Sequence, residues 1–228
     1  MSLSVPKISI GLVEDQFLFR KGMKSILGKW PNLDVIFESA DGFSVMEKLK
    51  AEKKLPDVML VDLSLPPQGQ REFSGVAVVE VLREEFPSIR IIILSVHSDE
   101  NFIIQLIERG AHAYLVKDSD PQEVYEAILA VHTKGSYINE KVLVAIQNNL
   151  GKKNKARTLS PAVQLTRREE EILRLICQQK TTEEIAEKLF ISIKTVNGHR
   201  NNLLHKTSSR NMAGLVMYAI KNGIVTLL

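Results

Sequence analysis

The first part of the chain alternates short apolar runs with amphipathic stretches, and this alternation limits the fold more than any other feature. Five runs rich in branched apolar residues have the length and composition of buried strands; they are residues 8–13, 33–37, 58–61, 89–94 and 113–116. The amphipathic stretches predict helices at residues 16–28, 42–53, 75–85, 99–109 and 121–133. Strict strand–helix alternation is typical of an α/β fold with a doubly wound, five-stranded parallel sheet.

The segment that follows this pattern has a different character. Residues 139–150 predict one more helix, and residues 151–161 are charged, contain Gly and Pro, and hold few large apolar side chains, as linkers do. The sequence therefore predicts an α/β domain over residues 1–135, a helix and linker over residues 136–164, and a second, all-α domain over residues 165–228.

The charge of the chain is distributed unevenly along it. Residues 1–150 carry 16 Lys and Arg against 21 Asp and Glu, a net charge of −5, and residues 151–228 carry 14 against 6, a net charge of +8. A basic region of this size favours a ligand with a phosphate backbone, because each neutralised phosphate releases condensed counterions. The charge thus indicates a nucleic-acid ligand for the C-terminal part, and a solvated basic surface is the alternative.

Hydropathy argues against a membrane protein. No part of the sequence has the run of about 20 apolar residues that a membrane-spanning helix needs. Pro6 and Lys7 interrupt the N-terminus before a long apolar signal segment can form. Cys177 is the single cysteine, which excludes an internal disulfide bond. We therefore expect no membrane contact and a cytoplasmic location.

Polar side chains stand at the points where the predicted strands end. In an open parallel sheet the binding site lies at the carboxyl ends of the strands, which share one edge of the sheet. Glu14 and Asp15 follow the first strand, and later strands end at Asp62, Ser95 and Lys117. The sequence therefore predicts one crevice that holds three carboxylates, a hydroxyl and an ammonium group.

This combination suits the transfer of a phosphoryl group. Three carboxylates repel one another unless a cation lies among them, and a hard ion with oxygen ligands such as Mg²⁺ fits the set. Aspartate can act as the nucleophile, and the metal neutralises charge on the phosphoryl group. We expect Lys117 to pair with the oxygens of a phosphoryl group on Asp62, and the Ser95 hydroxyl to donate a hydrogen bond to it.

At these positions the chain resembles the receiver domain of two-component response regulators. The match covers residues 5–133 and rests on Glu14-Asp15, Asp62, Ser95, Tyr114 and Lys117. The resemblance implies a flavodoxin-like fold, with Asp62 as the phosphoacceptor and a sensor histidine kinase as the partner that phosphorylates it. It also implies that Tyr114 is an aromatic switch and that Mg²⁺ is bound by Glu14, Asp15, Asp62 and the backbone carbonyl of Ser64.

Two features depart from the receiver pattern. The family commonly has a glycine nearer to the acceptor Asp than Gly75, its counterpart here, so the loop from Pro66 to Ser74 is longer than usual. Shielding of the acceptor and recruitment of a kinase are two interpretations of this loop. Because a long surface loop costs little free energy, we favour a third, a tolerated insertion. Lys117 is followed by Asp118 and not by the proline of many receivers, so the resemblance implies no cis peptide bond there.

The basic C-terminal region predicts three consecutive short helices. Thr166 is a good N-cap with Glu169 three residues later, which is the spacing of a capping box. A second helix fits residues 182–189, and Ser192 caps a third helix over residues 193–204. The tight turn before the third helix is typical of a helix-turn-helix, whose second element enters the major groove of DNA.

The third of these helices has an apolar face and a polar face. With about 100° of rotation per residue, the residues expected toward the core are Ile193, Val196, Leu203 and Leu204. The opposite face comprises Lys194, Gly198, Asn201 and His205, flanked by Asn197 and Asn202. Asparagine can read adenine edges and lysine suits guanine or phosphate, so this face has base-reading chemistry. A merely solvated polar face is the alternative.

Residues 165–228 resemble the DNA-binding domain of LuxR, NarL and FixJ-type response regulators. The motifs Leu-Thr-Arg-Arg-Glu, Glu-Ile-Ala, Ser-Ile-Lys-Thr-Val and His-Arg-Asn-Asn-Leu occur in this order. The resemblance implies that double-stranded DNA contacts the third helix at Lys194, Thr195, Asn197, Gly198 and Asn201. It also implies that the last helix, over residues 212–222, helps to form a homodimer on DNA.

We therefore interpret the chain as a DNA-binding response regulator in which phosphorylation of Asp62, by a kinase or a small acyl phosphate, controls dimerisation and transcription. RNA polymerase is a further candidate partner. We do not expect an enzyme, because aspartate-based phosphatases resemble Asp-x-Asp at the nucleophile, and the second residue after Asp62 is Ser64. The alternative is a regulator whose receiver senses or dimerises without phosphorylation. We also hypothesise that the acidic, unphosphorylated receiver covers the basic recognition helix.

Overall fold

The computed structural model describes residues 7–66, 74–96, 99–153 and 163–225. The chain forms two compact units, one made of residues 1–97 with 113–132 and the other of residues 98–112 with 133–228. Among the helices within the described ranges, none combines the length and the apolar character that a membrane span requires.

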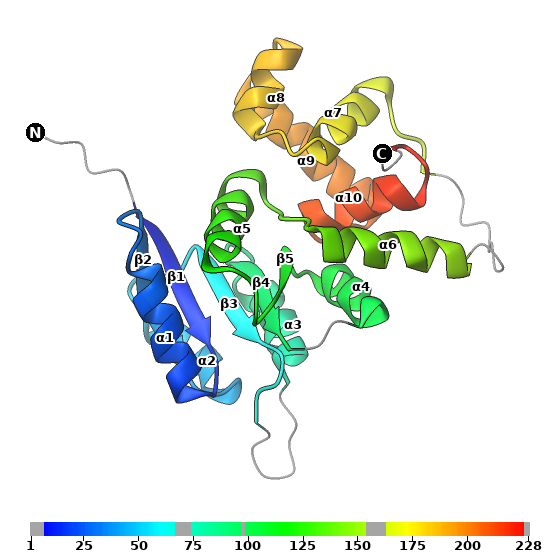
Figure 1. Ribbon diagram of the computed structural model, residues 1–228. Helices are drawn as coiled ribbons and strands as arrows, with labels where there is room; N and C mark the ends of the chain where they lie inside the picture. The colour runs from blue at the N-terminus through cyan, green and yellow to red at the C-terminus, as the bar shows by residue number, and fades with distance from the viewer. Residues whose placement is uncertain (1–6, 67–73, 97–98, 154–162, 226–228) are drawn as a thin grey trace, which may run out of the picture. The chain divides into compact units, whose positions relative to one another are not determined.

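The first unit is built on a parallel sheet of five strands in the order β2-β1-β3-β4-β5 (Figure 1). The strands are β1 (Ile8–Val13), β2 (Leu33–Ser39), β3 (Val58–Asp62), β4 (Arg90–Ser95) and β5 (Ala113–Val116). The order reverses between β1 and β3, which is the topological switch point where open parallel sheets bind their ligands. The expected five-stranded, doubly wound α/β fold is confirmed.

The strands form where the sequence has uninterrupted branched apolar side chains. Ile91, Ile92 and Ile93 of β4 are all fully buried, as expected for a strand covered on both faces. The helices that pack in this unit are α1 (Phe17–Leu27), α2 (Phe43–Ala51), α3 (Gly75–Glu85) and α5 (Pro121–Lys134). Just after α1, the ring of Trp30 stacks on Tyr125 of α5 with ring centroids 4.7 Å apart, which ties these two helices together.

The second unit is all-α in its described residues. Its helices are α4 (Glu100–Arg109), α6 (Glu140–Lys153), α7 (Arg167–Cys177), α8 (Thr182–Leu189), α9 (Ile193–Thr207) and α10 (Met212–Lys221). The predicted capping box of Thr166 and Glu169 is confirmed at the start of α7, and Thr181 with Glu184 forms a second capping box at the start of α8. These caps satisfy backbone N–H groups that a helix start leaves without partners.

Some elements extend beyond their predicted ends. Helix α6 continues past Leu150 to Lys153, into the segment predicted as linker, since one glycine is tolerated inside a helix and lysine favours it. Strand β2 continues to Ser39 because its pairing with β1 persists to that residue. Helix α9 ends at Thr207 rather than Leu204. The rest of the predicted linker, residues 154–161, and most of the long loop after Asp62 lie outside the described residues.

Candidate functional site

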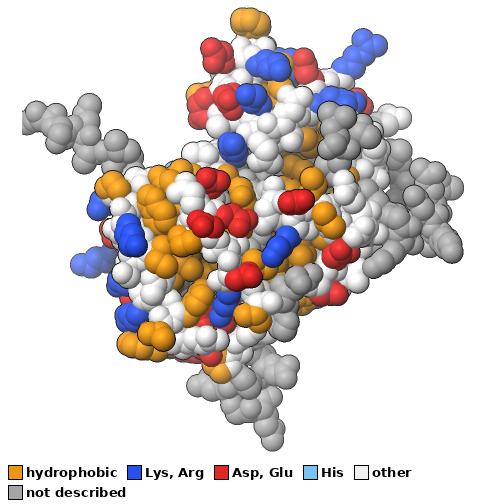
Figure 2. Space-filling view, in the orientation of Figure 1, with side chains coloured by type: hydrophobic (Ala, Val, Ile, Leu, Met, Phe, Trp, Pro, Cys, Tyr) orange, Lys and Arg blue, Asp and Glu red, His pale blue; other side chains and the backbone are white. Residues whose placement is uncertain are grey.

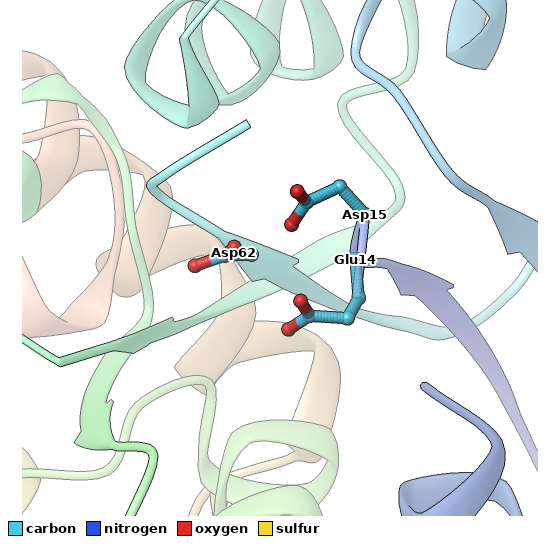
Figure 3. Close-up of side chains that lie close together, drawn as sticks. All are labelled: Glu14, Asp15 and Asp62. Atoms are coloured by element: carbon cyan, nitrogen blue, oxygen red, sulfur yellow. The ribbon is translucent and has the colours of Figure 1, made fainter. Parts of the chain in front are cut away.

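Three carboxylates meet at the carboxyl ends of β1 and β3 (Figure 3). Glu14 and Asp15 directly follow β1, and Asp62 is the last residue of β3. Val13 and Val61 are partners in the parallel register, so the residues after them lie side by side. One oxygen of each carboxylate lies within 4.8 Å of the others. The structure thus brings together the acidic residues that the strand-end pattern predicted.

Lys117, which follows β5, extends its side chain to this group of carboxylates. Its Nζ lies 2.8 Å from Oε2 of Glu14 and 3.1 Å from Oδ2 of Asp62. Its backbone N–H donates to the carbonyl of Ser95 at 2.8 Å, which fixes the end of β5 beside the end of β4. Burial lowers the pKa of Lys117, but the bonds with Glu14 and Asp62 outweigh burial and leave the pKa raised. The ammonium group therefore carries its charge at neutral pH.

One ammonium group does not balance three carboxylates. Burial raises the pKa of Glu14, and the charge of Asp62 adds to this rise, while the hydrogen bond from Lys117 opposes it. Within the described residues, Oδ1 of Asp15 is buried and has no hydrogen-bond partner, and the buried Oε2 of Glu14 and Oδ2 of Asp62 have only the ammonium group of Lys117 beside them. Buried carboxylate oxygens in this state are suitable ligands for a hard divalent cation. The residues present therefore fit such an ion.

The other residues predicted for this site lie at different depths. Ser95 ends β4 and is fully buried. The backbone N–H of Ser64 donates to Oδ1 of Asp62 at 3.2 Å, so the chain turns back over the carboxylate directly after β3. Tyr114 lies inside β5, opposite Ile93, and its ring is fully buried below the edge of the sheet. Ser95 and Ser64 thus lie at the crevice, and Tyr114 lies in the core beneath it.

Gly75, the first residue of α3, packs directly against the backbone of Asp62. A Cβ atom at this position would lie 2.2 Å from the carbonyl oxygen of Asp62 and 2.6 Å from the Cα of Leu63. The N–H of Gly75 also donates to the carbonyl of Leu63 at 3.2 Å. Only glycine allows this approach, because any side chain would overlap the backbone. The residue that the sequence matched to the receiver glycine therefore holds the strand end that carries Asp62.

Arg20 belongs to the site as well, although the sequence reasoning missed it. Its guanidinium donates to the backbone carbonyl of Glu14 and, at 3.4 Å, to that of Asp15. Nε of Arg20 also lies 3.5 Å from a carboxylate oxygen of Glu38 in β2. Arg20 thus fixes the backbone of both acidic residues. No sequence signal identified it, because its partners at the acidic residues are backbone carbonyl groups, which every residue has.

Helix α9 exposes the face expected to read DNA. The residues predicted to contact DNA are all exposed: Lys194, Thr195, Asn197, Gly198 and Asn201. Only Val196 and Leu203 of this helix are buried. Ser192 caps the helix, since its hydroxyl accepts from the N–H of Thr195 at 3.1 Å. No atom outside the helix lies within 4 Å of where a Cβ of Gly198 would be, among the residues described.

Two of the four expected core positions on α9 are not buried. Ile193 is 48% exposed, and Leu204 is only partly buried. Ile193 is the first residue of the helix and lies at the edge of the apolar face, one turn before Val196. At that end of the helix it leaves the core and joins the polar face. The prediction that Ile193 packs inward is therefore wrong.

Helix α10 is almost entirely buried within the second unit. The buried residues of this helix are Met212, Ala213, Gly214, Leu215, Val216, Met217, Ala219 and Ile220. Its neighbours are α7, α9, α6 and α4. Nδ2 of Asn211, the N-cap of α10, donates to the carbonyls of Gly110 and Ala111 at 2.8 and 2.9 Å. Helix α4 is thus tied to the helix for which the resemblance implied a role in dimerisation.

The fold and the site define a class: a receiver-like α/β unit with an acidic crevice, and a helix-turn-helix whose polar face is exposed. Residues 10–129 match the family described as response regulator receiver domain, and residues 163–219 match bacterial regulatory proteins of the luxR family. The chain belongs to the LuxR-type response regulators, which are transcription regulators that bind DNA.

Individual relatives span the whole chain. The transcriptional regulatory protein DegU of Brevibacillus brevis is 33% identical to this chain over 96% of this chain and 95% of its own length. The oxygen regulatory protein NreC of Staphylococcus aureus is 32% identical over 96% of this chain and 99% of its own. A structure of RcsB from Salmonella enterica serovar Typhimurium, bound to a promoter, is similar in fold with a TM-score of 0.56 and 22% identity, covering 95% of this chain and 99% of RcsB.

Proposed function

We propose that Asp62 accepts a phosphoryl group and that this modification controls DNA binding by α9. The observation that carries the proposal is the convergence of Asp62, Glu14 and Lys117 beside a buried carboxylate oxygen of Asp15 that has no hydrogen-bond partner among the described residues. A carboxylate oxygen of Asp62 attacks the phosphorus atom, and the bond from phosphorus to the donor breaks as the new bond forms.

The residues around Asp62 have separate tasks in this reaction. Glu14, Asp15, Asp62 and the backbone carbonyl of Ser64 would hold Mg²⁺, which neutralises charge on the arriving phosphoryl group when bound. Lys117 pairs with a phosphoryl oxygen, because its ammonium group lies next to the carboxylate of Asp62. The Ser95 hydroxyl donates to another oxygen, and Tyr114 responds to the movement of Ser95 from its position in the core.

The phosphoryl donor is a sensor histidine kinase, and exposed apolar residues beside the crevice support a protein donor. Phe17 is 65% exposed and Leu18 is 85% exposed at the start of α1, directly after Glu14, Asp15 and Gln16. Figure 2 shows hydrophobic side chains exposed on the face of the first unit that carries α1 in Figure 1. Apolar side chains next to a buried acceptor suit a protein that must bring its phosphoryl group to that acceptor.

The regulator acts on double-stranded DNA through α9. Lys194, Thr195, Asn197, Gly198 and Asn201 form one exposed face whose side chains suit bases and phosphates. The protein binds as a homodimer to two half-sites in the cytoplasm, and RNA polymerase is the partner through which it acts on transcription. RcsB, which shares the fold, has been solved on a promoter.

Release of α10 couples the two events. Helix α4 is the element that follows Ser95 in the chain, and the end of α4 holds Asn211 at the start of α10. Movement of Ser95 toward the phosphoryl group would shift α4, break the two hydrogen bonds of Asn211, and free α10 for the dimer. This route competes with the hypothesis that the receiver covers the recognition helix, because it leaves α9 exposed throughout.

Phosphate uptake tests the proposal. The purified chain, treated with acetyl phosphate and Mg²⁺, should gain the mass of one phosphoryl group, and EDTA should prevent the gain. Asp62→Asn keeps the shape of the side chain but lacks the nucleophile, so it should gain nothing. Uptake by the variant at the wild-type rate would show that Asp62 is not the acceptor. No uptake by the wild-type chain would favour a receiver that works without phosphorylation.

A further inference from the structure

A short turn joins α8 to α9 (Figure 1). Two large apolar side chains are exposed at this turn. Phe190, which follows the last residue of α8, is 95% exposed, and Ile193, the first residue of α9, is 48% exposed. Within the described residues 163–225, Val163 at 37% is the only other exposed large apolar side chain. The pair is therefore unusual for this region.

Phe190 does not serve the stability of the fold. Its backbone is left-handed, with φ 55° and ψ 43°, a conformation in which the Cβ atom is crowded and which favours Gly or Asn. The turn needs that conformation to end α8, where the N–H of Phe190 donates to the carbonyl of Glu187 at 3.2 Å. A side chain with 95% exposure gains almost nothing from packing. In the free protein, phenylalanine is thus unfavourable here for two reasons: its backbone conformation is crowded, and its apolar side chain is exposed to water.

The location of the pair indicates what covers it. Ile193 directly precedes Lys194 and Thr195 on the recognition helix, and the first turn of α9 contains no acidic residue. The N-terminal residues of a recognition helix approach the base edges, and the N-terminus carries a partial positive charge that favours phosphate. The apolar group that a base pair presents in the major groove is the C5-methyl group of thymine. The apolar pair is thus continuous with the proposed DNA-reading face.

We propose that Phe190 and Ile193 form an apolar contact with duplex DNA, in which Ile193 packs on a thymine methyl group and Phe190 on the sugar beside it. This inference rests on the proposed function of α9 and adds a preference for thymine at the edge of each half-site. Burial against DNA would compensate for the exposure and the strained backbone of Phe190. The two residues would thus help the regulator to choose its binding sequence.

The first test uses the full chain, treated with acetyl phosphate and Mg²⁺, and a duplex selected from a random pool by the wild-type protein. Phe190→Gly should raise the melting temperature or leave it unchanged, and should weaken binding to this duplex by about fourfold or more, as expected for lost apolar burial. Phe190→Asn, which also tolerates the left-handed backbone, should behave in the same way. A lower melting temperature in both variants, or unchanged DNA affinity in both, would overturn the proposal for Phe190.

The second test removes the methyl group from the DNA. Replacing thymine by uracil in the selected duplex should weaken DNA binding by the wild-type protein by about fourfold. The same replacement should leave DNA binding by Ile193→Ala unchanged. Equal losses in both proteins would show that Ile193 does not read the methyl group. The outcome is separate from the proposed function, which would fail if the wild-type protein selected no sequence from the pool at all.

Discussion

The side-chain amide of Asn211 donates a hydrogen bond to the backbone carbonyl of Gly110 at 2.8 Å, across 101 residues of sequence. The carbonyl oxygen of the same side chain accepts from the N–H of Gly214 at 2.9 Å and so begins α10. One buried side chain therefore both starts α10 and ties it to the end of α4.

Asn211→Asp separates these two roles. The carboxylate still accepts from the N–H of Gly214, but it cannot donate and it faces the carbonyls of Gly110 and Ala111. Loss of these bonds should cost about 1 to 3 kcal/mol and favour released α10. We expect the unphosphorylated variant to dimerise at lower concentration than wild type in sedimentation equilibrium.

The matched control for this variant is Asn222→Asp at the other end of α10. Asn222 is exposed, and its side chain bonds the carbonyl of Tyr218 within the same helix. The control should leave the monomer–dimer equilibrium as it is in wild type. If Asn211→Asp is monomeric at every concentration at which the wild-type protein is monomeric, the contact with α4 does not restrain α10.

Gly75→Ala should disturb the acceptor backbone. The new Cβ would lie 2.2 Å from the carbonyl oxygen of Asp62, so either β3 or α3 must move. We expect a loss of about 1 to 3 kcal/mol in the free energy of unfolding and a slower uptake of phosphate from acetyl phosphate. Gly22→Ala is the control, since no atom lies within 4 Å of its Cβ position, and alanine should stabilise α1 by about 0.5 to 1 kcal/mol. Chemical denaturation measures the free energy of unfolding of both variants. Equal stabilisation by both substitutions would exclude the close approach of Gly75 to the backbone of Asp62.

Exchanging Phe17 and Leu18 for serine tests the proposed kinase contact. Both side chains are largely exposed, so the fold should tolerate the double variant. The rate of phosphorylation by a histidine kinase that uses the wild-type chain should fall about tenfold, or about 1.4 kcal/mol. The rate with acetyl phosphate should not change, because a small donor needs no protein surface. A kinase rate equal to that of wild type would place the docking surface elsewhere.

Asn201→Ala and Lys194→Ala should weaken DNA binding in different ways. If Asn201 reads a base, Asn201→Ala should reduce the free energy of binding to a selected duplex by about 1 to 3 kcal/mol, and should reduce binding to unrelated DNA only a little. Lys194, if it contacts phosphate, should weaken binding to all duplexes alike and reduce the dependence of affinity on salt. Titrations of both variants on both duplexes at several salt concentrations measure this. The same uniform loss in both variants would remove the base-reading role of Asn201.

Much of the phosphorylation site could be predicted from the sequence, because its residues come directly after apolar runs that are recognisable as strands. Glu14, Asp15 and Asp62 are brought together by parallel pairing alone. Arg20 and Asn211 could not be found in this way, since both bind backbone carbonyls and since Asn211 depends on a contact across 101 residues.

Helix periodicity predicted the recognition helix but failed at its end. A helical wheel assumes that the core extends along the whole helix, whereas Ile193, the first residue of α9, is exposed and Val196 and Leu203 are buried. The end of α6 was misplaced for a different reason. Gly151 and the charged residues after it resemble a linker, yet their backbone remains helical to Lys153. Local composition indicates which segments are polar and does not decide whether a polar segment is helical.

The central claim is that phosphorylation of Asp62 controls DNA binding, and one comparison of affinities tests it most directly. Wild type and Asp62→Asn are titrated onto the duplex selected by the wild-type protein, before and after treatment with acetyl phosphate and Mg²⁺. We predict that treatment tightens binding by wild type about tenfold or more, a change of about 1.4 kcal/mol or more, and leaves Asp62→Asn at the affinity of the untreated wild type. An equal gain in both proteins, or no gain in either, would contradict the account.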